Sequence, residues 1–193
     1  MQPWTSPDSQ VSLLRPATAR PLTSDEAVST LMSPGWRLVW GADERAPGRL
    51  VVRLMLKVVP DTRTGTAVEV LQVGRSADPV AVGSCLRYGL DSGSGERRPD
   101  RVINGVRFAA WSNGDAGMSQ GIGGTDLRAV VRGVCYAVER YTVSESASAG
   151  DPAVTLRRQE GAAELDVSLA SLRIGRGAAT PPLVRLPPGA VAR

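Results

Sequence analysis

The sequence predicts an α+β fold, in which a twisted antiparallel sheet carries a C-terminal amphipathic helix packed on it. Three observations predict it: runs of β-branched residues, two tight hairpin turns, and one helical pattern near the C-terminus. The chain has 193 residues, of which 42% are hydrophobic, enough for one domain with a core of ordinary size. We place that domain at residues 23–175, between a flexible lead at 1–22 and a proline-rich extended tail at 176–193.

The first half of the sequence predicts two short helices or turns and three strands. Four prolines interrupt any helix in the lead. A capping box with Thr23 and Glu26 predicts a short helix that ends before Pro34. Strands follow at 36–40, 49–59 and 66–73, and then a short helix or turn runs from Asp78 to Cys85. Residues 89–99 are rich in glycine, serine and charge, which predicts a loop.

The second half holds the clearest local signals. Asn104-Gly105 predicts a hairpin within 101–111, and Arg132-Gly133 predicts a second one between 127–131 and 134–143. The glycine-rich stretch 112–125 between them is expected to be a loop. In the last strand, alternation places Tyr136 and Val138 on one face and Cys135 with Glu139 on the other. Residues 152–172 have helical spacing of their leucines, with Pro152 at the helix start.

The two cysteines and the lack of histidine limit the chemistry. Cys85 and Cys135 either form a disulfide or are two buried thiols. The intervening segment folds back as a hairpin, which favours the disulfide, worth about 4 kcal/mol for a loop of about 50 residues. Without histidine there is no Ser-His or Cys-His pair. We therefore predict no catalytic residue, no metal site and no cofactor.

Two further patterns could carry chemistry. Ser119 lies in a G-x-S-x-G match, but a nucleophile elbow needs a following helix and a histidine base. Asp115, Asp126, Glu139 and Asn113 could gather around calcium or form an acid–base pair, or they could be solvated turn residues. Their spacing matches no calcium loop. If Glu139 faces inward, it must meet an arginine or a backbone donor, as part of a structural pair.

The basic residues are almost all arginine, since Lys57 is the only lysine among 23 Lys and Arg. The net charge of +4 is spread along the chain, so we predict no nucleic-acid partner. Arg97 and Arg98 form the densest pair and are candidate binding residues, because arginine suits carboxylate or phosphate contacts.

The aromatic residues and the tail supply further candidates for binding. Trp36, Trp40 and Trp111 are either core residues or an exposed platform for a sugar or a partner loop. The tail prolines, including Pro181 and Pro182, would dock as an extended arm.

The stretch 85–172 resembles small secreted bacterial domains of uncharacterised function, which are PsbP-like in layout. The resemblance is carried by Cys85, by I-N-G-V-R-F at 103–108, by D-A-G-M at 115–118 and by G-V-C-Y-A-V-E at 133–139. It implies export, paired cysteines and a role other than catalysis. Asp115 and Met118 belong to its second motif and are candidate binding residues.

Our leading functional hypothesis is an exported interaction protein, an accessory subunit of a bacterial envelope assembly or an inhibitor, with a protein partner there. The alternative is a periplasmic module for a glycan, lipid or peptidoglycan fragment, and a histidine-free hydrolase comes third. The expected location is periplasmic or outer-membrane-associated, with possible peripheral membrane association through an N-terminal lipid anchor. It would be cytoplasmic if Met1 is the native start, because the N-terminus shows no signal-peptide pattern. The oligomeric state stays open.

Overall fold

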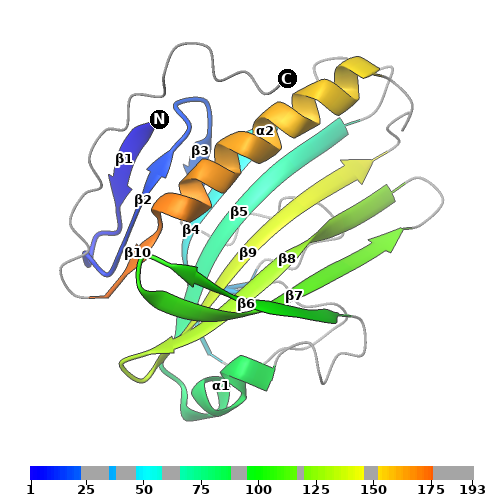
Figure 1. Cartoon of the computed structure of the whole chain (residues 1–193). Coiled ribbons are helices and arrows are strands. Elements are labelled where there is room, and N and C mark those ends of the chain that lie inside the picture. The colour runs from blue at the N-terminus through cyan, green and yellow to red at the C-terminus, as the bar shows by residue number, and fades with distance from the viewer. Residues whose placement is uncertain are drawn as a thin grey trace.

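The computed structural model describes residues 1–22, 35–37, 47–57, 66–87, 95–116, 120–145 and 152–175. These residues form two antiparallel sheets with one long helix between them (Figure 1). The large sheet has the order β3-β4-β5-β9-β8-β7-β6, and the small one has the order β1-β2-β10. The α+β prediction is confirmed.

The bounds of the elements follow the chain. The strands are β1 (Gln2–Thr5), β2 (Val11–Arg15), β3 (Arg20–Leu22), β4 (Arg49–Lys57), β5 (Thr66–Ser76), β6 (Glu96–Ile103), β7 (Val106–Ala116), β8 (Gln120–Val131), β9 (Val134–Glu145) and β10 (Arg173–Ile174). The helices are α1 (Pro79–Ser84), the 3-10 turn η1 (Cys85–Arg87) and α2 (Pro152–Ser171).

Two tight turns connect the strands of the large sheet as predicted. Asn104 and Gly105 have φ of 45° and 83° between β6 and β7, and Arg132 and Gly133 have φ of 51° and 74° between β8 and β9. Positive φ at both central residues is the requirement of a type I′ hairpin turn. The Asn104 side chain also donates to the carbonyls of Ala170 and Leu172, which ties this turn to the end of α2.

The main core lies between α2 and the large sheet. Leu165 and Leu169 of α2 pack with Leu71 of β5 and Val138 of β9, and all four are at most 1% exposed. The even-numbered residues of β9 face this layer, as the alternation predicted. The helix predicted at 152–172 is confirmed within one residue.

The N-terminal prediction is wrong in the described residues. Residues 1–22 contain three strands instead of a flexible lead, and Val11 and Leu13 are fully buried in the main core. Proline excludes helix but is compatible with short edge strands. The domain therefore begins near residue 2. The short helix predicted at 23–33 and the tail at 176–193 lie outside the described residues, as does most of the strand at 36–40.

Two predicted loops are also wrong. Residues 112–116 and 120–125 extend β7 and β8, and residues 96–99 belong to β6. One of the glycines in these strands, Gly124, lies where neighbouring groups approach closely. A Cβ atom on Gly124 would lie 2.2 Å from the Arg140 carbonyl oxygen and 2.6 Å from the Tyr141 ring. The glycine is thus explained by close packing.

Candidate functional site

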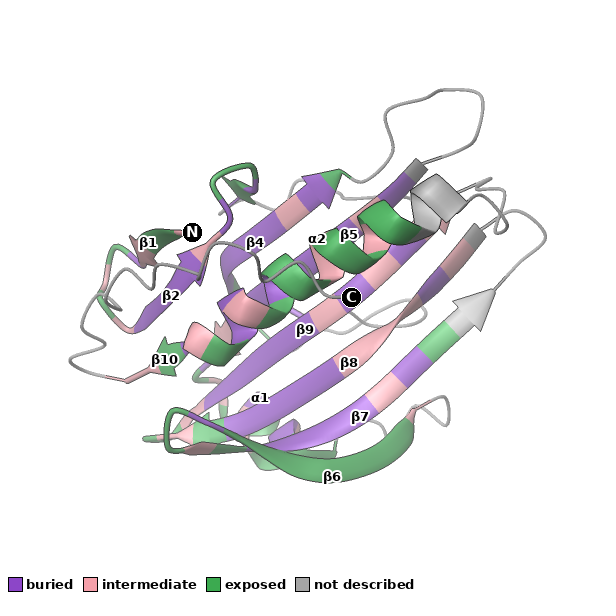
Figure 2. Cartoon of the chain, turned by 45° about the horizontal axis from the view of Figure 1, so that its top comes forward, coloured by how far each residue is buried: buried purple, intermediate pink, exposed green. Residues whose placement is uncertain are grey.

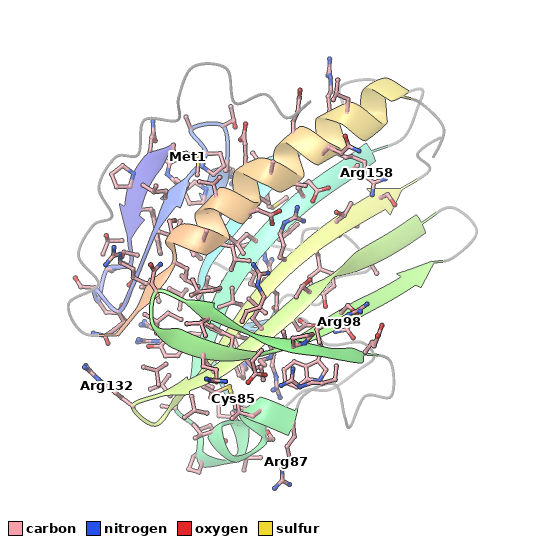
Figure 3. The ribbon with its side chains drawn as sticks, in the orientation of Figure 1. Met1, Cys85, Arg87, Arg98, Arg132 and Arg158 are labelled. Atoms are coloured by element: carbon pink, nitrogen blue, oxygen red, sulfur yellow. A yellow bond between two sulfur atoms is a disulfide. The ribbon has the colours of Figure 1, made fainter. Side chains whose placement is uncertain are left out.

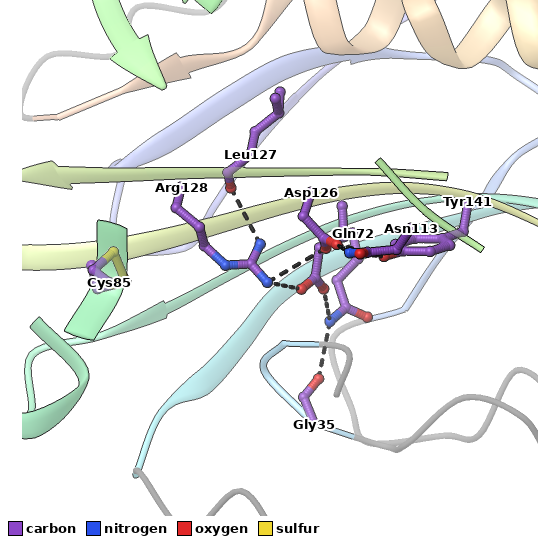
Figure 4. A network of polar contacts seen from close by, with 10 residues as sticks. Gly35, Gln72, Cys85, Asn113, Asp126, Leu127, Arg128 and Tyr141 are labelled. Atoms are coloured by element: carbon purple, nitrogen blue, oxygen red, sulfur yellow. Dashed lines mark hydrogen bonds and ion pairs between the residues drawn. A yellow bond between two sulfur atoms is a disulfide. The ribbon is translucent and has the colours of Figure 1, made fainter. Parts of the chain in front are cut away.

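Polar side chains form a continuous row on the sheet face opposite α2. In register across neighbouring strands, Arg53 pairs with Gln72, Gln72 with Glu139, and Glu139 with Asp126. Three further residues, Arg128, Asn113 and Tyr141, lie on the same face by alternation (Figure 4). Five adjacent strands therefore contribute to what we call the polar row.

Hydrogen bonds connect the row from β4 to β9. Arg53 Nε donates to Gln72 Oε1 at 2.6 Å, and Gln72 Nε2 donates to Glu139 Oε2 at 3.0 Å. Gln72 Nε2 also donates to the carbonyl oxygen of Gly35 at 3.1 Å. That contact holds the described segment 35–37 against the sheet.

The other half of the row is centred on Arg128. Its guanidinium donates to Glu139 Oε1 at 2.6 Å and lies 3.4 Å from Asp126 Oδ1. The Tyr141 hydroxyl donates to Asp126 Oδ2 at 2.6 Å, and Asn113 Nδ2 donates to the same oxygen. The prediction that an inward-facing Glu139 would form a structural pair with an arginine is confirmed.

Burial sets the protonation of this half of the row. Burial raises the pKa of Asp126, and the attraction of Arg128 offsets only part of that. Burial also raises the pKa of Tyr141, and the neighbouring carboxylates Asp126 and Glu139 raise it further. The tyrosine therefore remains a donor. Since Asp126, Arg128 and Glu139 have no exposed surface, these three charged groups are held inside the fold as a structural network.

The disulfide between Cys85 and Cys135 is present, as predicted. It joins η1 to β9 with a Cα–Cα distance of 5.8 Å, at the end of the sheet beside α1 (Figure 3). Both sulfurs are buried, in a cluster with Trp36, Ala81 and Ala137.

The described tryptophans belong to the interior. Trp36 is 7% exposed and Trp111 is fully buried, so the platform interpretation is wrong for these two and the core interpretation is confirmed. Arginines cover both rings: the Arg37 guanidinium lies 4.9 Å from the Trp36 centroid, and that of Arg97 lies 5.0 Å from Trp111. Trp40 lies outside the described residues.

Arg97 and Arg98 remain on the surface, but both have intramolecular partners. Arg97 donates to the Ala110 carbonyl at 3.1 Å and pairs with Asp100. Arg98 donates to Ser112 at 2.9 Å and pairs with Glu96 at 2.8 Å.

The remaining predicted site residues fall elsewhere. Asp115 lies near the end of β7, and nothing is described of its side chain. Met118, Ser119, Pro181 and Pro182 lie outside the described residues. The interpretation of Asn113, Asp126 and Glu139 as solvated turn residues is wrong, because all three are buried, and Arg128 lies between the two carboxylates.

Two clefts open on the described surface. One, of about 330 Å³, lies between α2 and the sheet and is lined by Glu69, Thr142 and Arg158. Burial raises the pKa of Glu69, although Arg140 and Thr142 both donate to its carboxylate. The second, of about 460 Å³, lies beside Arg49 and Arg75 at the ends of β4 and β5. No sequence pattern predicted either cleft, because their residues come from separate elements that meet only in the folded chain.

Within the described ranges, no group of three or more cysteine, aspartate or glutamate side chains is arranged to hold a metal ion. No helix in the same ranges has the length and apolar character needed to cross a membrane.

Distant structural similarities to known proteins include the following two. The crystal structure of LpqN, a protein involved in cell envelope biogenesis of Mycobacterium tuberculosis, has a TM-score of 0.47 and 8% identity, covering 90% of each chain. A structure from Bacteroides thetaiotaomicron has a TM-score of 0.44 and 11% identity, covering 92% of this chain and 50% of that one. Neither similarity identifies a function. No family model and no curated protein matches the chain.

Proposed function

We propose that this chain is an exported, non-catalytic interaction protein of the bacterial cell envelope. The observation that carries the proposal is the buried disulfide between Cys85 and Cys135. Structural disulfides form and persist in oxidising compartments such as the periplasm and are rare in the cytosol. The resemblance of residues 85–172 to small secreted bacterial domains supports the same compartment.

The compartment is tested by thiol trapping in intact cells that express the natural gene. Cells are quenched in acid and alkylated under denaturing conditions, with or without prior reduction. We expect no alkylation before reduction and two alkyl groups afterwards. Two alkyl groups in the unreduced sample would overturn the assignment of export.

Edge strand β6 is the surface we propose for the partner. Residues 96–102 are all exposed, and among the described strands β6 pairs only with β7 (Figure 2). It carries Arg97, Arg98 and Arg101 against Glu96 and Asp100, so its net charge is positive. Pro99 and a register shift between Arg98 and Arg101 interrupt the ladder, which disfavours addition of a regular strand. Side-chain recognition of an acidic protein segment fits this surface best.

The partner surface is tested by charge reversal. Arg98→Glu with Arg101→Glu should abolish photocrosslinks to a protein partner from a probe placed at residue 102 in cells. Arg157→Glu, an exposed position on α2, is the matched control and should leave the crosslinks intact. Crosslinks that survive the reversal on β6 would exclude this surface.

The alternative, a module for a glycan, lipid or peptidoglycan fragment, loses its described tryptophan platform. It keeps one supporting feature, the cleft beside Arg49 and Arg75.

A further inference from the structure

Two arginines face each other at the ends of neighbouring strands. Arg49 of β4 and Arg75 of β5 are register partners in the antiparallel pair. Like charges directly opposite each other destabilise a sheet, so this arrangement needs an anion between the two guanidinium groups.

The anion is supplied by the chain itself. Both guanidinium groups contact the same oxygen, Asp8 Oδ2, and the Arg75 contact is 2.6 Å long. The other oxygen, Asp8 Oδ1, accepts from the Ser6 hydroxyl at 2.7 Å and from the Gln10 N–H at 3.2 Å. One carboxylate thus faces two guanidinium groups, so the three groups Asp8, Arg49 and Arg75 together carry a net charge of +1.

The Asp8 carboxylate is ionised and open to solvent. Burial raises the pKa of Asp8, but its hydrogen bonds with Ser6 and Gln10 and the charges of Arg75 and Arg49 outweigh burial and lower it overall. The Arg49 side chain is 55% exposed, and those of Asp8 and Arg75 are 31% and 21% exposed. A ligand can therefore reach the place that the Asp8 carboxylate occupies.

An apolar cleft of about 460 Å³ adjoins the two arginines. Its other lining includes Pro47, Ala77 and Val134. Two polar residues also line it: Ser76 Oγ donates to the Pro47 carbonyl, and Asp78 Oδ1 caps α1 by accepting from Val80 N and Ala81 N. A position that binds an anion, beside an apolar wall, suits an amphiphile.

We infer that Arg49, Arg75 and this cleft form a binding site for an amphiphile with a phosphate or carboxylate head and a short apolar tail. The Asp8 carboxylate is an internal competitor for the head-group position. The ligand must displace it, after which both guanidinium groups donate to the incoming anion.

The test measures binding of dodecyl phosphate, below its micellar concentration, to the full chain by calorimetry. Asp8→Asn keeps the shape of the side chain and removes its charge, so we expect roughly tenfold tighter binding. Adding Arg75→Gln to that variant should weaken binding at least tenfold, while Arg157→Gln, at an exposed position on α2, should leave it unchanged. Methyl phosphate should bind more weakly than dodecyl phosphate, because it has no tail for the cleft.

A second arm identifies the source of the head group. Sedimentation with phosphatidylglycerol vesicles that is enhanced by Asp8→Asn and lost with Arg75→Gln indicates a bilayer lipid. Binding of dodecyl phosphate without vesicle sedimentation indicates a free amphiphile. The inference is overturned if neither probe binds, if Asp8→Asn fails to tighten binding, or if Arg157→Gln weakens binding as much as Arg75→Gln does. If the Asp8→Asn variant does not fold, the comparison of Arg75→Gln with Arg157→Gln in the otherwise unchanged chain decides.

Discussion

Removing the disulfide should lower the free energy of unfolding by about 4 kcal/mol. Cys85 and Cys135 are 50 residues apart in sequence. In the chain-entropy model, closing a loop of that length removes about 14 cal/mol/K from the unfolded chain, or about 4 kcal/mol at 25 °C. Domains of this size are stable by about 5–15 kcal/mol, so the reduced protein should keep about 1–11 kcal/mol.

Urea unfolding measured by tryptophan fluorescence tests this value. Trp36 packs in the same cluster as the disulfide and reports on its surroundings. With a slope of about 2 kcal/mol/M, the midpoint should fall by about 2 M on reduction. In the double variant Cys85→Ala with Cys135→Ala, the urea midpoint should fall at least as far, because the variant also loses the packing of both sulfur atoms.

The comparison of reduced protein with the double variant separates the crosslink from the packing. If reduction alone lowers stability by less than about 1 kcal/mol, the crosslink does not act through the unfolded chain and the chain-entropy reasoning is refuted for this protein.

Three other perturbations test the sheet. Gly124→Ala should lower the free energy of unfolding in urea by about 1–3 kcal/mol, because the added Cβ atom would lie 2.6 Å from the Tyr141 ring. At Gly123 an added Cβ atom would meet nothing within 4 Å, so Gly123→Ala should change that free energy by less than about 0.5 kcal/mol. Equal effects of the two substitutions would contradict the packing argument. Arg128→Met leaves two buried carboxylates without their cation and should cost about 3–5 kcal/mol, against almost nothing for exposed Arg157→Met. Burial and nearby carboxylates raise the pKa of Tyr141 above 10.0. The stabilisation that the protonated Tyr141 hydroxyl gives the folded state is therefore complete below pH 10. It is lost as the pH rises further, because the hydroxyl ionises first in the unfolded chain. The alkaline loss of thermal stability should be smaller in Tyr141→Phe, and an unchanged pH profile would exclude this residue as its cause.

Features set by neighbouring residues were predictable from the sequence. The turns at Asn104-Gly105 and Arg132-Gly133 follow from the positive φ that a two-residue hairpin requires. The position of α2 follows from the spacing of its leucines. The alternation along β9 also placed Glu139 on the same face as Cys135, and it predicted that an inward-facing Glu139 would meet an arginine or a backbone donor.

The tertiary structure decided what depends on strand register. Residues 2–5 pair with 11–15, and 11–15 pair in turn with β10, which lies more than 150 residues later and has no local signal. The glycine-rich residues 112–125 were predicted to be a loop, because the sequence does not show why a glycine is needed at position 124. The close approach of Tyr141 to Gly124 exists only once β8 and β9 are paired. The polar row and the contact of Asp8 with two arginines likewise join residues far apart in the chain. Local sequence determines backbone angles, whereas the burial and meeting of distant side chains arise only when the whole sheet is assembled.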